Sequence, residues 1–266
     1  MDSQRRQLGI LSYRINAFCN KVHLNCPELV PVISYPRQIN DREYSSRLKE
    51  LEMMGVNSIL PVGNTKIGKF SILGKGGVGL VVKVESNDRK TYALKIRRID
   101  ANRRSMEREV KLHKIAISAG VGPYIYANSE NFILMEFIDG CNIIGWLNHQ
   151  NINVDQVRKV VISTLEQCYR LDRANLDHGE LSCLDHHVLV SESVNAHIID
   201  FESSSIDRKT RNVTAAAHSL LLNGTVSRRV TNSIHFAERE KIIQLLRMYK
   251  WNQTRSSFDK ILQAFG

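Results

Sequence analysis

Cysteine is scarce in this 266-residue sequence, and long apolar runs are absent from it. Its five cysteines form no CxxC pair and are odd in number, which predicts free thiols rather than a disulfide framework or a zinc ribbon. No stretch approaches the roughly 18 consecutive apolar residues of a membrane span, and the first residues lack an apolar signal core with a cleavage site. We therefore expect a cytoplasmic globular chain with no membrane segment.

Positive charge is in excess, with 37 Lys and Arg against 27 Asp and Glu and a formal net charge of +10. Such an excess favours an anionic partner, such as RNA, a ribonucleoprotein particle or an acidic protein. The basic residues are scattered rather than clustered in blocks, so a solvated basic surface is an equally good interpretation. Charge leaves the partner open and says nothing about the fold.

The first half of the chain reads as one helix followed by short strands. Asn40 and Glu43 form a capping-box pattern, apolar residues follow at helical spacing, and Gly55 stands where a helix would stop near Met54. Strand-like runs follow as VNSILPV, KFSILG, LVVKVES and TYALKIR, with a hairpin turn expected at residues 86–88. This order predicts an antiparallel meander.

The second half reads as mainly helical. A helix is predicted at about residues 102–118 and a strand at NFILMEF, and a later helix should bury one face at positions 157, 161, 164, 168 and 171. Two short strands, HVLV and AHIID, interrupt the helices, which resume near Asn212. The prediction is an α+β chain of two lobes, a small antiparallel sheet with one helix and then a mainly helical lobe.

Three segments follow from this organisation. Residues 69–138 would form the sheet lobe and residues 139–266 the helical lobe. Residues 1–68 would be an N-terminal extension or a small helical, winged-helix-like module, and the prolines within residues 1–40 predict short helices broken by turns.

Residues 74–81 read GKGGVGLV, a GxGxxGxV pattern between two strand-like runs. Glycines at such positions let the backbone approach phosphate oxygens and donate its N–H groups to them. A glycine-rich hairpin that is only a turn is the alternative. A Rossmann loop would need a helix after the glycines, and the β-branched run LVVKV argues against one.

Two later segments are candidate functional elements because of their positions after this loop. Lys95 lies 19 residues after Gly76 among apolar neighbours, where an ammonium group is costly unless it is paired; a water-facing lysine on an edge strand is the alternative. Residues 132–140, FILMEFIDG, form an apolar strand that ends in an acidic residue and turns at glycine. Taken by itself, that segment is better explained as a buried edge strand.

The most informative stretch is HGELSCLD at residues 178–185, followed 15 residues later by DFE at residues 200–202. Phosphoryl transfer needs a carboxylate that accepts the hydroxyl proton, together with oxygen ligands for magnesium. Glu180, Asp185 and Asp200 offer all three groups.

Together these elements, over about residues 70–205, resemble the protein-kinase-like superfamily, and most of all its RIO-type kinases, the small kinase of the KEOPS complex and the aminoglycoside phosphotransferases. The resemblance implies a two-lobed fold that binds ATP and Mg²⁺ and phosphorylates a serine or threonine hydroxyl of a protein. It makes Glu180 the catalytic acid/base, while Lys95 holds the α and β phosphates and is fixed by Glu109, or by Glu107 as second choice. The positions implied for binding are Gly74, Gly76, Gly79, Val81, Lys95, Glu109, Met135, Glu136 and Ile138 for ATP, and Asp185 and Asp200 for Mg²⁺.

The chain also departs from the family pattern. Glu180, Asp185 and Glu202 replace the usual aspartate, asparagine and glycine, and a catalytic group misplaced by about 1 Å costs about a hundredfold in rate. No APE-like element or long activation segment follows Asp200. An active kinase, which could label itself or act as an ATPase, therefore stands beside a pseudokinase scaffold and a small-molecule kinase. Basic residues at 208, 209 and 211, together with Arg228 and Arg229 if these lie nearby, are candidates to receive an anionic substrate, or are a solvated helix start.

Overall fold

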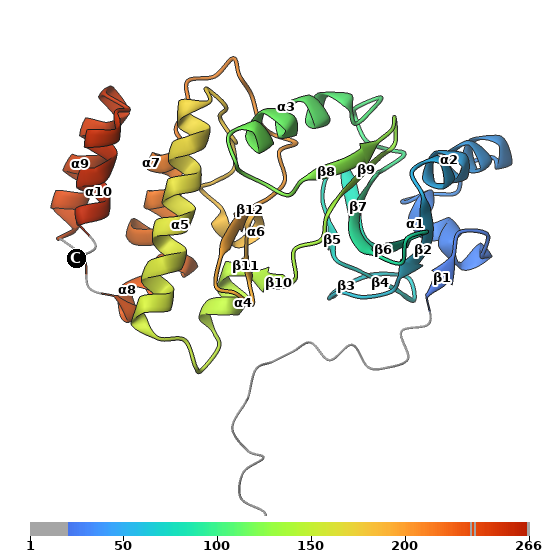
Figure 1. The fold of residues 1–266 in the computed structure, drawn as a ribbon, viewed down its shortest axis with the longest axis horizontal. Helices are drawn as coiled ribbons and strands as arrows, with labels where there is room; N and C mark the ends of the chain where they lie inside the picture. The colour runs from blue at the N-terminus through green and yellow to red at the C-terminus, as the bar shows by residue number, and fades with distance from the viewer. Residues whose placement is uncertain (1–20, 235, 237, 265–266) are drawn as a thin grey trace, which may run out of the picture. The chain divides into compact units, whose positions relative to one another are not determined.

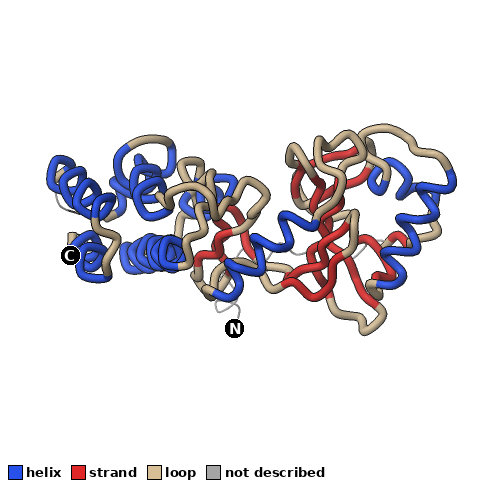
Figure 2. Tube along the Cα trace, turned by 90° about the horizontal axis from the view of Figure 1, so that it is seen from above, coloured by secondary structure: helices blue, strands red, loops and turns tan. Residues whose placement is uncertain are grey.

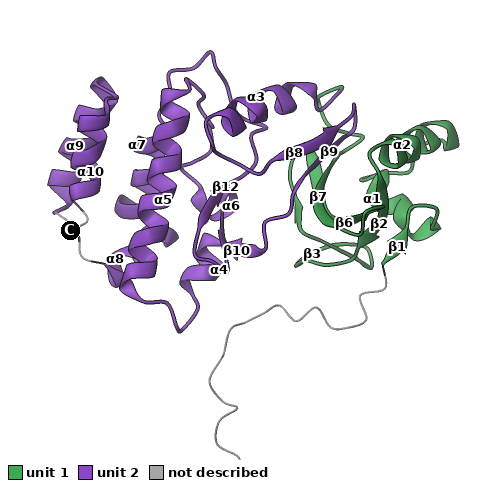
Figure 3. Cartoon of the chain, viewed as in Figure 1, with its two compact units in different colours: residues 1–104 green, residues 105–266 purple. Residues whose placement is uncertain are grey.

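The structure is a computed structural model that describes residues 21–234, 236 and 238–264. The chain divides into two compact units, residues 1–104 and 105–266 (Figure 3). Strands dominate the first unit and helices the second (Figure 2), which confirms the α+β class. The predicted segment boundaries at 68/69 and 138/139 stay predictions.

The first unit is built on an antiparallel sheet (Figure 1). Within this unit the strand order is β1-β2-β6-β7, with β5 paired to β6, while β3 and β4 form a separate hairpin. The strands are β1 (Val22–His23), β2 (Val56–Leu60), β3 (Thr65–Ile67), β4 (Phe70–Ile72), β5 (Gly74–Lys75), β6 (Gly79–Ser86) and β7 (Thr91–Arg97). The expected β6–β7 turn is present, closed by a 3.0 Å bond from Ser86 N to Lys90 O.

The predicted helix before the sheet is also present, as α2 (Asp41–Met53). The Asn40 side chain accepts a hydrogen bond from Glu43 N at 2.9 Å, and the left-handed Gly55, with φ of 73°, ends the helix. Short η1 (Pro27–Leu29) and α1 (Val30–Ile33) precede it, as the prolines predicted. The part of this prediction that covers residues 1–20 lies outside the described residues.

A buried arginine joins these helices to the sheet. Arg47 of α2 is 1% exposed, and its Nη1 donates to Ile33 O and to Arg97 O, both at 2.9 Å. Because a buried guanidinium is costly unless its N–H groups are bonded, these contacts make α1 and α2 integral to the sheet unit.

The second unit is mainly helical. Its helices are α3 (Glu107–Ser118), α4 (Ile143–Leu147), α5 (Val154–Arg173), α6 (Leu184–His187), α7 (Asn212–Ala217), η2 (His218–Leu222), α8 (Thr225–Ser233), α9 (Arg239–Trp251) and α10 (Arg255–Gln263). Its strands are the β8 (Ile125–Asn128) and β9 (Phe132–Glu136) hairpin and a small antiparallel sheet of β10 (Gly140–Asn142), β11 (Val188–Ser191) and β12 (Ala196–Ile198). α3 begins later than expected, because the N–H of Met106 bonds to Glu130 O at 2.9 Å and not to a helical carbonyl.

The core of this unit forms around α5. All five residues of the predicted helix face are buried: Val157, Val161, Thr164, Cys168 and Leu171. The four cysteines within the described residues are free thiols, as expected, and Cys19 lies outside that part of the chain. None of the described helices has the length and apolar character needed to cross a bilayer.

Candidate functional site

The glycine loop is a tight hairpin between β5 and β6. Gly76 N donates to Gly79 O at 2.8 Å, and the Arg98 side chain donates to Gly76 O at 3.0 Å. Gly74, Gly76 and Gly77 lie outside the left-handed region, and a Cβ atom added at Gly74 or Gly77 would meet nothing within 4 Å. Since the backbone does not require glycine there, these residues leave open space in which a ligand can approach the main chain.

Gly79 is different, because the chain itself fills the space beside it. A Cβ atom at Gly79 would lie 3.0 Å from Ile96 O and 3.2 Å from Lys95 Cγ. Lys95 stands opposite Val81 in the β6–β7 register. It is only 4% exposed, so the water-facing alternative for this lysine is wrong.

The choice between the two glutamates of α3 follows from burial. Glu109 is 3% exposed, whereas the Glu107 side chain is 70% exposed and pairs with Lys111 at 2.8 Å on its own helix. Glu109 is therefore the better candidate to fix an ammonium group. Its pairing with Lys95 stays a prediction.

The end of β9 carries the residues expected to meet adenine. Glu136 N donates to Tyr124 O at 2.8 Å, and the Glu136 carboxylate accepts from Tyr124 N at 3.3 Å. Met135 and Ile138, on either side of Glu136, are half-buried. Because the Glu136 N–H is already used, a base that binds at this residue would have to use its carbonyl oxygen.

The acidic loop before α6 has a backbone that only glycine can adopt. Gly179 has φ of 94°, and a Cβ atom there would lie 2.8 Å from Ser203 O. The next residue, Glu180, has a 40% exposed side chain whose carboxylate lies 3.7 Å from His187 Nε2. Its carbonyl accepts a 2.9 Å bond from Cys183 N, so the loop turns tightly while this carboxylate stays accessible from solvent.

Asp185 and Asp200 lie at the same end of the β11–β12 hairpin. Asp185 is in α6, which leads directly into β11, and Asp200 comes two residues after β12 ends. The strands pair Val188 with Ile198, and Ile199 N extends the ladder by donating to His187 O at 3.0 Å. Asp200 has a left-handed backbone, with φ of 69°, which aspartate adopts more readily than most residues.

Buried histidine and phenylalanine rings pack against one another next to this part of the site. His178 is fully buried, and its ring lies 5.2 Å from the rings of His187 and Phe201. Phe201 stacks on His113 at 4.7 Å. Burial, and secondly the neighbouring His187, lower the pKa of His178 from 6.5 to about 4. His178 is therefore neutral near pH 7, and its Nε2 lies 3.1 Å from Ile199 O.

Sequence reasoning missed a buried polar network that connects α5 to the backbone of the acidic loop. Asp172 on α5 is 3% exposed; it accepts from Asn212 N and Nδ2, at 2.9 and 2.8 Å, and from Tyr249 Oη at 3.0 Å. Asn212 in turn accepts from His178 N at 2.9 Å and donates to Leu176 O at 2.8 Å. Burial raises the pKa of Asp172, although these hydrogen bonds oppose that shift. The only signal in the sequence was a carboxylate next to the apolar face of a helix.

The basic residues after Asp200 differ in whether the chain itself already binds their side chains. The Arg208 side chain is already bound within the chain, because its Nε lies 3.0 Å from Asp177 Oδ2 and its Nη2 donates to Ser203 O at 2.6 Å. Lys209 is exposed. Arg211 donates its backbone N–H to Asp177 Oδ1 at 3.3 Å, while its side chain lines a cavity.

The residues present fit a nucleotide with magnesium better than a metal held by protein alone. Across the described residues, no three His, Cys, Asp or Glu side chains gather into a metal site. Magnesium usually takes one or two protein carboxylates and completes its shell with phosphate oxygens and water. Within the helical unit, Asp185 and Asp200 match that need. Within the sheet unit, taken by itself, the open space at Gly74 and Gly77 leaves room for phosphate groups.

Comparison with known proteins gives little direct guidance. No family model matches the sequence, and no curated protein matches it. Among solved structures, the chain is similar to the autoinhibited serine kinase domain of the giant muscle protein titin, with 20% identity and a TM-score of 0.39 over 50% of this chain. The match spans 44% of that chain, less than half of its length. Any family assignment therefore has to come from the residues themselves.

Proposed function

We propose that the chain is an ATP- and Mg²⁺-dependent phosphotransferase of the protein-kinase-like type, closest to RIO-type kinases, that transfers the γ-phosphate of ATP to a protein hydroxyl. The observation that carries this proposal is the β5–β6 hairpin with its open glycines and with buried Lys95 in register with Val81. A glycine loop on an antiparallel hairpin is typical of kinases, whereas a Rossmann loop opens a helix.

Each residue then has a chemical task. The N–H groups of the glycine loop and the Lys95 ammonium bind phosphate oxygens, and Glu109 fixes that ammonium. Asp185 and Asp200 would hold Mg²⁺, which supplies charge neutralisation for the phosphates when it is bound. The neutral His178 and the Asp172–Asn212 network keep the acidic loop in one conformation, which serves a site that works by orientation.

The transfer step moves one proton and one phosphoryl group. The acceptor hydroxyl oxygen forms a bond to the γ-phosphorus as the bond between that phosphorus and the β–γ bridging oxygen breaks, and ADP leaves with the electron pair. The hydroxyl proton passes to the Glu180 carboxylate. Its 40% exposed side chain suits this task, because a general base must reach the proton that it accepts.

A second candidate function is a pseudokinase that binds nucleotide without transferring phosphate. It is favoured by the 3.7 Å approach of His187 Nε2 to the Glu180 carboxylate, because a contact with this ring would compete with a substrate hydroxyl for the carboxylate. The two candidates share nucleotide binding and differ only in turnover.

The test is incubation of the full chain with radiolabelled ATP and Mg²⁺, scoring label on protein against free phosphate. Asp200→Asn should abolish transfer because it removes a metal ligand. Asp207→Asn is the matched control, since it makes the same chemical change at an exposed position of the following segment. Equal transfer in the wild type and Asp200→Asn would reject the kinase proposal. Tight nucleotide binding without turnover in the wild type would favour the pseudokinase.

A further inference from the structure

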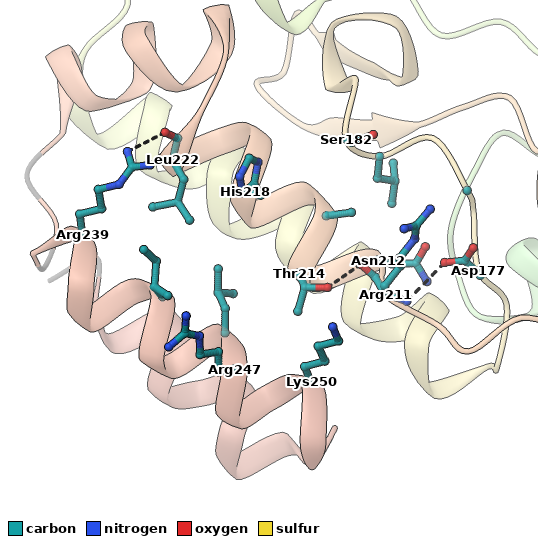
Figure 4. Close-up of a pocket in the computed structure, with 15 residues that line it drawn as sticks. Asp177, Ser182, Arg211, Asn212, Thr214, His218, Leu222, Arg239, Arg247 and Lys250 are labelled. Carbon is teal, nitrogen blue, oxygen red and sulfur yellow. Dashed lines mark hydrogen bonds between the residues drawn. The ribbon is translucent and has the colours of Figure 1, made fainter.

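A cavity of about 540 Å³ lies beside the acidic loop, within the helical unit (Figure 4). Its walls come from the loop at Gly179, Leu181 and Ser182, from α7 and η2, and from α9. The three loop residues flank Glu180, so the cavity opens next to the proposed base. It lies outside the segments assigned to nucleotide and magnesium.

The cavity wall is strongly cationic. Four lining residues carry positive charge, namely Arg211, Arg239, Arg247 and Lys250, against a single carboxylate, Asp177. That carboxylate is already paired with Arg208 at 3.0 Å. Arg239 is fixed by a 2.8 Å bond from its Nη1 to Leu222 O. The wall therefore has an excess of positive charge that the chain itself does not neutralise.

The remaining cations are available to a ligand. Within the described residues, the side chains of Arg211, Arg247 and Lys250 make no hydrogen bond or ion pair, and all three residues are exposed. Figure 4 shows Arg247 and Lys250 on α9, with Lys250 directed at the segment of Thr214. Three unpaired cations around one hollow are mutually repulsive, and an anion bound among them would relieve that repulsion.

The cavity also has an apolar part. Leu181, Leu222, Ile243 and Leu246 line it between the cations, and Leu181 and Leu246 are only 1% and 8% exposed. No Phe, Tyr or Trp side chain is among the lining residues. Recognition of single-stranded nucleic acid usually relies on aromatic platforms for the bases, so this lining favours a polypeptide with acidic and aliphatic side chains over RNA.

We propose that this cavity binds an acidic segment of the protein substrate, with carboxylates at Arg211, Arg247 and Lys250 and an aliphatic side chain on the leucine floor. This inference rests on the proposed function, because it makes the segment a neighbour of the hydroxyl that is phosphorylated. It selects an acidic protein from the anionic partners that the net charge of +10 left open.

The experiment measures binding without nucleotide, by fluorescence anisotropy of a short labelled peptide with one serine, one leucine and several glutamates. The cavity variant is Arg247→Glu with Lys250→Glu. The matched control is Arg228→Glu with Arg229→Glu, which makes the same change in net charge on the exposed face of α8, outside the cavity. Because Lys250 lies in the last turn of α9, where a negative charge opposes the helix dipole, Arg247→Gln with Lys250→Gln is measured as well.

The cavity variant should raise the peptide Kd by about tenfold or more, while the control changes it by less than about twofold. The glutamine pair should give an intermediate loss, and peptide binding should weaken as salt rises. A peptide with lysines in place of its glutamates should not bind. Equal losses in the cavity and control variants would overturn the proposal, as would a single-stranded RNA that displaces the peptide and loses affinity in the cavity variant.

This result separates the inference from the proposed function. Peptide binding that depends on the cavity, in a chain that transfers no phosphate, would support the cavity site and reject the kinase. Phosphorylation of serine peptides with equal efficiency whether they are acidic or basic would support the kinase and overturn the role of the cavity.

Discussion

The two loops that carry the candidate chemistry are built in opposite ways. At the glycine loop of the sheet unit, Gly74 and Gly77 have unstrained backbones with no atom near the position of a Cβ. At the acidic loop of the helical unit, Gly179 has φ of 94° and is closed in by Ser203 O and Arg208. Asp200 also adopts the left-handed conformation.

This contrast matches the tasks proposed for the two loops. A loop that covers phosphates has to leave room for a ligand and gains nothing from being filled by the chain itself. A loop that presents a base and metal ligands has to hold carboxylates in fixed positions. In the helical unit that rigidity comes from Asn212, which links the buried Asp172 to the backbone of His178.

The largest effect should come from removing the cation beside the open loop. Lys95→Ala should lower phosphate transfer by about a thousandfold or more, because it deletes the proposed phosphate ligand, and charge stabilisation is a large part of such catalysis. Lys90→Ala, at an exposed position in the β6–β7 turn, is the control and should retain wild-type turnover. Steady-state transfer from ATP would measure both, and near-normal activity in Lys95→Ala would remove the ligand role of this lysine.

Local patterns were sufficient to predict most of the fold. The α5 face was readable because apolar residues repeat at helical spacing, and the β6–β7 hairpin because a turn separates two β-branched runs. Helical spacing also favoured Glu109 over Glu107, whereas the burial of Lys95 depends on packing, which spacing does not encode. The Asp172–Asn212 network was invisible because its two residues are 40 positions apart and are common types.

The folding stability of the helical unit should depend on His178 remaining neutral. Its pKa is lowered from 6.5 to about 4, so between these values the unfolded state takes up a proton that the folded state does not. Stability is therefore complete above about pH 6.5 and is lost as the pH falls toward 4, by about 3 kcal/mol at most. Urea unfolding of the wild type and His178→Gln across this range should show that the variant lacks this slope.

His149→Gln is the control for that experiment, since this histidine is exposed and should leave the wild-type slope in place. An identical pH dependence of the unfolding free energy in the wild type and His178→Gln would mean that protonation of His178 does not set this dependence.

The proposed base on the acidic loop, Glu180, should show a smaller, purely kinetic effect. Glu180→Gln keeps the shape of the side chain and should preserve nucleotide affinity while turnover falls by about a hundredfold. Glu180→Asp keeps the charge but shortens the reach, so turnover should fall if the loop is adapted to glutamate. Single-turnover transfer with saturating ATP separates rate from binding, and an unchanged rate in Glu180→Gln would exclude this residue as the base.

The smallest effect tests the contrast between the loops directly, by making the same change in each. Gly179→Ala should destabilise the fold by about 1–3 kcal/mol, because alanine at φ of 94° is strained and its Cβ would lie 2.8 Å from Ser203 O. Gly77→Ala should change stability by less than about 0.5 kcal/mol, since its Cβ projects into open space. The same Cβ would occupy the region proposed for phosphate, so ATP affinity should fall in Gly77→Ala although its fold is intact. Thermal unfolding paired with nucleotide titration measures both quantities, and a Gly77→Ala variant that loses stability but keeps its affinity would show that the open loop serves the fold rather than a ligand.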